Sequence, residues 1–94
     1  MRIDRFLVFV RLAKSRTLAQ AIIGSGHVRV DGKRIEKSSE LVRVGAIVAL
    51  PIDGRVRILR VLSLPSRRGP AAEARACYDE LVPKQAIDEI GSAS

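Results

Sequence analysis

Apolar residues near the start of the chain recur at helical spacing. Ile3, Phe6, Leu7 and Val10 stand at positions i, i+3, i+4 and i+7, and the charged residues beside them lie off this stripe. Such a stripe forms one face of a helix and packs that face on a core. The pattern therefore predicts a first helix over about residues 3–12.

A second helix is predicted after a short basic link. Ser15 or Thr17 can cap its amino end, and Thr17 has Gln20 three residues further on, as in a capping box. Two glycines, Gly24 and Gly26, predict its end. We expect its buried side to consist of Leu18, Ala21 and Ile22.

The middle of the chain has the pattern of short strands. Residues that alternate, or that are rich in β-branched side chains, form the runs 27–30, 33–35, 47–50 and 55–62. The tight-turn dipeptide Asp31-Gly32 joins the first two runs, and turn-forming residues at 51–54 join the last two. We expect a small, curled sheet that is mainly antiparallel.

The last third of the chain favours helix. Pro70 suits a first helical turn, the alanines after it have high helix propensity, and Glu73 lies near the positive amino end. We expect a third helix over about residues 70–81, one further helical turn over 86–90, and a frayed end. The expected fold class is α+β, with two amino-terminal helices on a small curled sheet and a carboxyl-terminal helix.

Length and charge narrow the class of protein. Ninety-four residues suffice for one core and leave no room for a second, catalytic domain. With 17 Lys and Arg residues against 10 Asp and Glu residues, the formal net charge is +7, which makes nucleic acid the leading candidate partner. Fifteen of those 17 bases lie in residues 1–68, where we expect the binding domain, whereas the expected helical extension over residues 69–94 is acidic overall. A hydrophobic content of 47% excludes a disordered basic tail.

Other residue types exclude further classes. Cys77 is the only cysteine and forms no internal disulfide, so a reduced, cytoplasmic setting is expected. No apolar run approaches the ~20 residues of a membrane span, and no signal peptide is apparent, so we expect a soluble, unprocessed protein. We also expect the free protein to be a monomer. His27 has no partners at metal-ligand spacing and forms no nucleophile-base set with Cys77. We therefore expect no metal, no cofactor and no catalytic residue.

A basic cluster lies where the first helix passes into the second. Arg11, Lys14 and Arg16 stand beside the free backbone amides that begin the second helix, so one phosphate can meet side chains and amides together. Arg5 lies one to two turns earlier on the exposed side of the first helix. Because aromatic residues make up only 3% of the chain, recognition of structured RNA by backbone and shape fits better than base stacking.

Residues 2–38 carry a longer motif. It reads Arg2-x-Asp4-Arg5-x-Leu7, then Arg11, Lys14-Ser15-Arg16, Ala19, Ile23, Gly26-x-Val28-x-Val30-x-Gly32 and Lys37-Ser38. This motif resembles the alpha-L RNA-binding domain, first described in the fourth protein of the small ribosomal subunit. A second segment, which resembles the part after this domain in the bacterial heat-shock protein fifteen family, reads Arg67-Arg68-Gly69-Pro70-Ala71-x-Glu73-Ala74 with Tyr78.

The resemblance implies a protein that binds ribosomal RNA on large ribosomal subunits carrying a stalled peptidyl-tRNA and aids their rescue or recycling. Transfer RNA on the same particle is a further candidate contact. By the same resemblance, the first helix and the link would face RNA through Arg5, Arg11, Lys14, Ser15 and Arg16, and the hairpin would extend that surface. The complete set of predicted RNA-binding residues is Arg2, Arg5, Arg11, Lys14, Ser15, Arg16, Arg29, Lys33, Arg34 and Lys37.

The sequence leaves two other classes of function open. The same domain is commonly fused to pseudouridine synthases, so the chain could be a detached module that assists such an rRNA-modifying enzyme. It lacks the length of that catalytic domain, and we do not expect it to be an enzyme itself. The second alternative is a basic membrane-surface protein, for which the helix over 3–12 is the only candidate, although the core already requires its apolar stripe.

Overall fold

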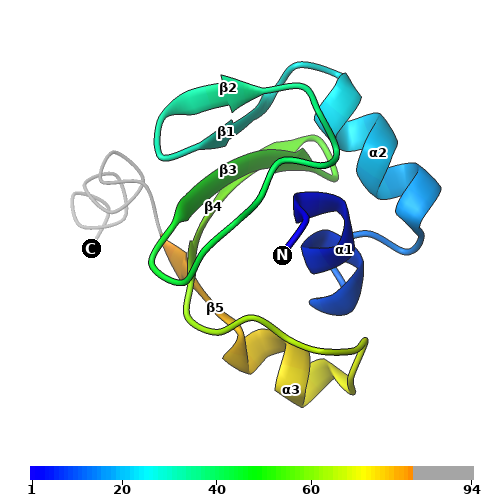
Figure 1. Cartoon of the computed structure of the whole chain (residues 1–94), viewed down its shortest axis with the longest axis vertical. Coiled ribbons are helices and arrows are strands. Elements are labelled where there is room, and N and C mark those ends of the chain that lie inside the picture. The colour runs from blue at the N-terminus through cyan, green and yellow to red at the C-terminus, as the bar shows by residue number, and fades with distance from the viewer. Residues whose placement is uncertain (82–94) are drawn as a thin grey trace, which may run out of the picture.

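The computed structural model describes residues 1–81 and has the α+β fold that the sequence predicts. Along the chain the elements are α1 (Ile3–Phe9), α2 (Arg16–Gly24), β1 (Val28–Val30), β2 (Lys33–Ile35), β3 (Ile47–Ile52), β4 (Arg55–Val61), α3 (Ala71–Ala76) and β5 (Tyr78–Leu81). The strands form one antiparallel sheet in the order β2-β1-β3-β4-β5. In Figure 1 the curved sheet lies to one side of α1 and α2, and α3 lies beyond its β5 end. No helix in this part of the chain has the length and apolar character that crossing a membrane requires.

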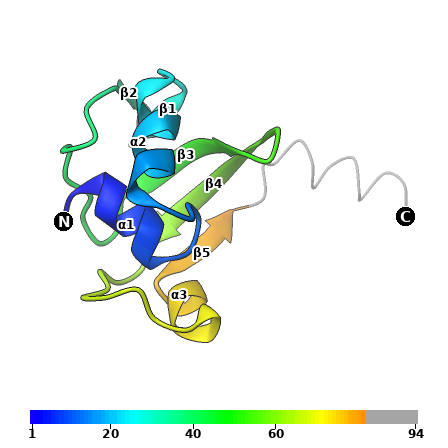
Figure 2. The same ribbon diagram turned by 90° about the vertical axis from the view of Figure 1, so that its right-hand side faces the viewer.

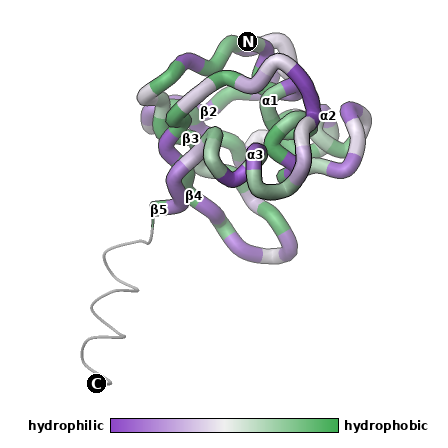
Figure 3. The backbone as a smooth tube through the Cα atoms, turned by 90° about the horizontal axis from the view of Figure 1, so that it is seen from below, coloured by the Kyte–Doolittle hydropathy of each residue, from purple (hydrophilic) through white to green (hydrophobic). Residues whose placement is uncertain are grey.

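The core lies between α1, α2 and the face of the sheet that they cover. Ile3, Phe6 and Leu7 of α1 are fully buried, and so is Ile23 of α2. They belong to one apolar cluster with the inward-facing strand residues Val28, Val48, Leu50, Leu59 and Val61. In Figure 3 the hydrophobic colour follows much of α1, inside the fold, and the hydrophilic colour is strong along β5. The apolar stripe of the first helix is therefore confirmed as the centre of the core.

The first helix is shorter than predicted. It ends at Phe9 instead of near residue 12, because Arg11 adopts the left-handed backbone conformation with a φ of 64°. The amides of Leu12 and Ala13 then turn back to the carbonyl of Leu7, at 2.9 and 3.0 Å. This reversal places the basic link directly against the end of α1.

The second helix begins at one of its two predicted caps. The Oγ of Ser15 accepts a hydrogen bond from the backbone amide of Leu18 at 3.2 Å, whereas Thr17 lies inside the helix. At the other end, α2 includes Gly24, and Gly26 follows with a φ of 81°. The predicted end of the helix is therefore confirmed.

The predicted buried side of α2 was wrong. Ala19 and Ile23 are fully buried, whereas Leu18 is 48% exposed, Ala21 is exposed and Ile22 is only half-buried. Since Ala19 and Ile23, and not Leu18 and Ala21, enter the core cluster, the helix is rotated by about 100° from the expected orientation. Leu18 consequently lies on the flank of the helix, outside the core, and Ile22 packs against the edge of the core.

Two hairpins turn on the pairs Asp31-Gly32 and Asp53-Gly54. All four residues have positive φ, from 52° to 81°, which is the conformation of the two-residue turn that matches the twist of paired strands. The first hairpin is confirmed as predicted. The second turn is shorter than the predicted one over 51–54, because β3 continues to Ile52 and pairs with β4 along its whole length.

The predicted third helix divides into a helix and a strand. α3 ends at Ala76, and β5 then pairs with β4, with Leu81 opposite Ile58. The prediction of one helix over 70–81 was therefore wrong. The open edge of β4 offers hydrogen-bond partners to residues 78–81, and the alanine-rich local sequence does not reveal this. The division of the chain at residue 68 into an RNA-binding domain and a helical extension stays a prediction. β5 follows that boundary in the chain and adds the last strand to the sheet that the earlier residues form. The helical turn at 86–90 and the frayed end lie outside the described residues.

Candidate nucleic-acid interface

Asp4, in the first turn of α1, is a fully buried carboxylate that gathers basic and polar groups. Arg2 binds both of its oxygens, with Nε 3.1 Å from Oδ1 and Nη2 3.0 Å from Oδ2. Arg16 and Gln20 of α2 donate to Oδ2 at 3.3 and 3.4 Å, and the backbone amide of Arg5 donates to Oδ1 at 2.8 Å. Asp4 therefore ties the start of α1 to the first turns of α2.

The Asp4 carboxyl group stays ionised although it is buried. Burial alone raises its pKa, but the hydrogen bonds from Arg2, Gln20, the Arg5 amide and Arg16 together outweigh burial, so the pKa of Asp4 lies below its ordinary value. One negative charge is shared by two guanidinium groups, and the cluster keeps a positive excess. The side chains of Arg2 and Arg16 are 40% and 52% exposed, so this excess faces solvent.

Arg16 is held in an orientation that suits an external anion. Among residues 1–81, its guanidinium bonds to protein only through Nε, which donates to Asp4. Its two Nη groups remain available as donors, and such a planar group can make two parallel hydrogen bonds to a phosphate. The first amides of α2 lie at the same end of the helix, where Ser15 satisfies one of them as the cap.

Arg11 is also fixed from one side. Its Nε donates to the carbonyl of Gly69 at 2.6 Å, across 58 positions of sequence. Arg11 and Lys14 line one groove on the flank of α2, and Lys14 is exposed there. Arg5 is exposed on α1. The structure thus gathers Arg2 and Arg16 around Asp4, and it brings Arg11 and Lys14 to a neighbouring groove.

The basic residues of the first hairpin occupy other surfaces. Arg29 and Arg34 lie directly opposite each other in the β1–β2 register, and strand alternation places them on the face of the sheet away from the helices. Arg34 pairs with Glu36 at 3.1 Å, and both side chains are more than 60% exposed, so the pair contributes little stability. Lys33 lies on the opposite face, and Lys37 is exposed after β2. The structure therefore places Arg29 and Arg34 away from the Asp4 cluster, whereas Lys37 directly precedes Ser38, whose carbonyl accepts a hydrogen bond from the Asp4 amide at 3.4 Å.

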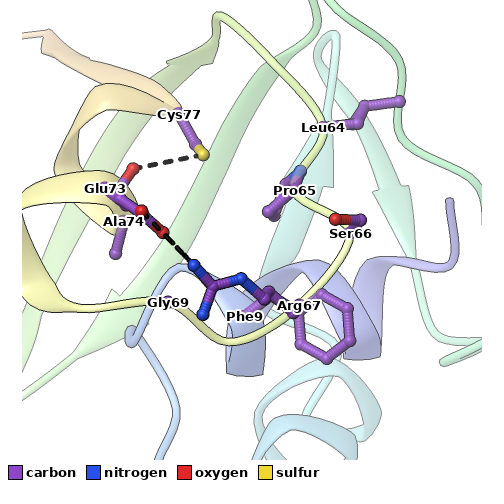
Figure 4. Close-up of a pocket in the computed structure, with 9 residues that line it drawn as sticks. All are labelled: Phe9, Leu64, Pro65, Ser66, Arg67, Gly69, Glu73, Ala74 and Cys77. Atoms are coloured by element: carbon purple, nitrogen blue, oxygen red, sulfur yellow. Dashed lines mark hydrogen bonds and ion pairs between the residues drawn. The ribbon is translucent and has the colours of Figure 1, made fainter.

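Two later arginines are engaged by acids. Arg57 donates through Nε to Glu80 at 2.9 Å and also through Nη2. This pairing raises the pKa of Arg57 and lowers that of Glu80. Arg67 reaches Glu73 at 3.2 Å across a pocket of about 270 Å³, as Figure 4 shows. These two arginines are thus less available to a polyanion than those of the Asp4 cluster.

The same pocket contains the one cysteine of the chain. Cys77 is 8% exposed, and its Sγ donates to the carbonyl of Glu73 at 3.4 Å (Figure 4). This is a buried thiol, as expected for a structural residue. In the described part of the chain, no three His, Cys, Asp or Glu side chains gather as a metal ion would require.

Sequence reasoning found the partners of Asp4 only in part. An acid placed between Arg2 and Arg5 indicates an ion pair with an arginine, and the structure confirms it. The hydrogen bond from Gln20 to Asp4 was not predicted, because the position of Gln20 in the sequence suggested only a capping box with Thr17. No local signal reveals the bond from Arg11 to Gly69, since both groups are brought together by the fold.

Comparison with known proteins places this geometry in a family. A family model described as the S4 domain, the alpha-L RNA-binding motif, matches residues 1–48. The heat shock protein 15 homolog of Haemophilus influenzae and heat shock protein 15 of Escherichia coli K12 are each 34% identical over 80 residues, or 85% of this chain. The chain spans about 60% of the length of these two curated relatives.

Two further matches cover different shares of the chain. Small ribosomal subunit protein uS4 of Limosilactobacillus reuteri is 39% identical over 49 residues, 52% of this chain and 24% of the relative. A solved trimeric structure of heat shock protein 15 from Vibrio cholerae has a TM-score of 0.84 and 27% identity, covering 99% of this chain and 93% of that one. The family match begins at α1 and includes both helices and the first hairpin. With these elements and the motif from Arg2 to Ser38 in place, the chain belongs to the S4 domain family.

Proposed function

We propose that this chain binds ribosomal RNA on large ribosomal subunits that carry a stalled peptidyl-tRNA, and that it aids their rescue or recycling. The observation that carries the proposal is the Asp4 cluster. There, a buried carboxylate holds two half-exposed guanidinium groups at the junction of α1 and α2. Similarity to heat shock protein 15 over 85% of the chain supports association with ribosomes, and the choice of particle follows from the family resemblance of the motif.

The cluster suits the phosphate backbone of a folded RNA. Arg2 and Arg16 are fixed by Asp4, so little side-chain entropy is lost when a phosphate binds. Arg11 and Lys14 lie in the neighbouring groove, and Arg5 is exposed on α1. We assign the primary phosphate contacts to these five residues, with Ser15 shaping the end of α2. The hairpin residues then extend the surface along a second part of the RNA: Arg29, Lys33, Arg34 and Lys37.

Sedimentation with purified particles tests the choice of particle. The particles are empty small subunits, empty large subunits, intact ribosomes, and large subunits bearing peptidyl-tRNA, each at two salt concentrations. We expect binding to the blocked large subunit to persist at the higher salt, because a specific site adds contacts to the non-specific phosphate term. Equal, salt-sensitive binding to every particle would leave a general RNA binder and overturn the rescue function.

A matched pair of variants tests the surface. Arg16→Ala removes a guanidinium of the Asp4 cluster, and Arg75→Ala removes one from α3, where it is exposed. Both variants lower the net charge equally. We expect only Arg16→Ala to weaken the salt-resistant binding. Equal loss in both variants would mean that net charge, and not this cluster, drives association.

A further inference from the structure

A groove of about 470 Å³ runs along the flank of α2. Its walls are the link that follows α1, the outward side of α2, and the tip of the β3–β4 hairpin. Figure 2 shows α2 lying in front of β3, with the β3–β4 hairpin projecting past it.

The middle of this groove is apolar. Leu18 and Ile22 are one helical turn apart on α2, and Ile52 of β3 lies on the facing wall. Leu18 is 48% exposed, and the core of the fold is complete without it, since Ala19 and Ile23 fill that role. A single exposed leucine is ordinary on a protein surface. Here, however, it lies with two isoleucines between charged groups at both ends of one groove.

The charges in the groove are arranged by sign. Arg11 and Lys14 line it beside α1, and the contact of Arg11 with Gly69 fixes that guanidinium. Asp53 lies at the hairpin tip, and the nearby Arg57 is neutralised by Glu80. A phosphate is therefore attracted most strongly to the link, where, among the described residues, two basic side chains line the groove and no acid does. An apolar group fits the space between the link and the hairpin tip.

We propose that this groove receives one unpaired nucleotide of the bound RNA. Its phosphate lies at Arg11 and Lys14, and its base lies against Leu18 and Ile22. Apolar side chains contact the faces of unstacked bases in this way when a loop or a bulge turns a nucleotide out of a helix. The inference rests on the proposed RNA binding and deepens it, because a protein that reads only duplex shape has no use for an apolar groove beside its phosphate contacts.

Two hairpin RNAs of the same stem sequence provide the probe. One is fully paired, and the other carries a single bulged adenosine. We expect the wild-type protein to bind the bulged RNA about tenfold more tightly in fluorescence anisotropy at fixed salt, which corresponds to burial of roughly 50–60 Å² of apolar surface. Equal affinity for the two RNAs would overturn the inference. Failure to bind either RNA would instead overturn the proposed function.

A pair of matched variants locates the effect. Leu18→Ala shortens the side chain in the groove, and Leu62→Ala shortens a leucine of similar exposure outside it, 47% against 48%. We expect Leu18→Ala to lose most of the preference for the bulged RNA while keeping its affinity for the paired one, and Leu62→Ala to behave as wild type. Equal effects of the two substitutions would overturn the inference. Thermal melting of both variants checks that each is folded.

A fluorescent base reports on the same step without any substitution. With 2-aminopurine at the bulge, we expect the emission to change when wild-type protein binds, because the base leaves water for an apolar surface. An unchanged emission at saturating protein would show that the base stays outside the groove and would overturn the inference.

Discussion

Replacing Asp4 by asparagine tests whether one buried charge organises the binding surface. The substitution keeps the size of the side chain and removes its charge, which leaves Arg2 and Arg16 without their shared anion. A hydrogen bond to a charged group contributes about 1.5–3 kcal/mol, and loss of one partner from a fully buried ion pair costs about 3–5 kcal/mol. Because both arginines are half-exposed, we expect Asp4→Asn to lower the free energy of unfolding by about 2–3 kcal/mol.

Melting at two pH values isolates the charge. The pKa of Asp4 is lowered in the folded protein from its ordinary value of 3.8, so the carboxylate stabilises the fold above that pH. That stabilisation is lost as the pH falls through the lowered pKa. We expect Asp4→Asn to melt roughly 10–20 °C below wild type at neutral pH, and the difference to shrink at a second pH that is low enough to protonate the Asp4 carboxyl group.

The control for this measurement is Asp79→Asn, which changes the same charge at an exposed position of β5. It should melt close to wild type at neutral pH. If Asp4→Asn and Asp79→Asn melt alike, or if the Asp4→Asn deficit is the same at both pH values, the buried charge is not the source of the stability.

RNA binding gives a second readout of the same perturbation. If Asp4 acts on binding by orienting Arg16, then Asp4→Asn should add little to the loss caused by Arg16→Ala when the two are combined. The measurement is a cycle of four affinities for one structured RNA, made below the melting temperature of the weakest variant. Fully additive losses would refute an orienting role.

Three further outcomes are expected. Arg16→Ala should reduce the slope of log affinity against log salt by about one unit, since one duplex phosphate contact is lost, and an unchanged slope and affinity would remove Arg16 from the interface. Phe6→Ala should lower the free energy of unfolding by about 3–5 kcal/mol, because the ring is fully buried, and normal melting would contradict its place in the core. Light scattering of the free protein should give a single-chain mass near 10.3 kDa, whereas three times that mass would match the trimer of the Vibrio cholerae relative.

The parts of the fold that follow from short-range pattern could be predicted. The stripe of Ile3, Phe6 and Leu7 is buried as expected, and Asp31-Gly32 forms its hairpin, because helical spacing and turn conformation are properties of neighbouring residues. The end of α1 at Phe9 was not predictable from pattern, since the reversal after it depends on Arg11, which adopts positive φ without being glycine.

Other features depend on contacts between distant segments. β5 exists because β4 offers it an edge, and the orientation of α2 is set by the burial of Ala19 and Ile23 in the core. The same distinction holds at the binding surface. The sequence names Arg2 and Arg16 as basic residues, but their grouping around Asp4, and the exposure of Leu18, follow only from the way that the two helices meet.

The two outer strands of the sheet bear on how the molecule avoids aggregation. β2 and β5 are only three and four residues long, and each carries adjacent charges, Lys33-Arg34 on one and Asp79-Glu80 on the other. Short, charged edges hinder the pairing of two identical edges from neighbouring copies, because their like charges repel each other. Without β5, the seven residues of β4 would form the outer edge instead, with Val56 already 65% exposed beside it. We therefore expect a fragment that ends before β5 to be prone to self-association, because β5 covers the edge of β4 from Ile58 to Val61.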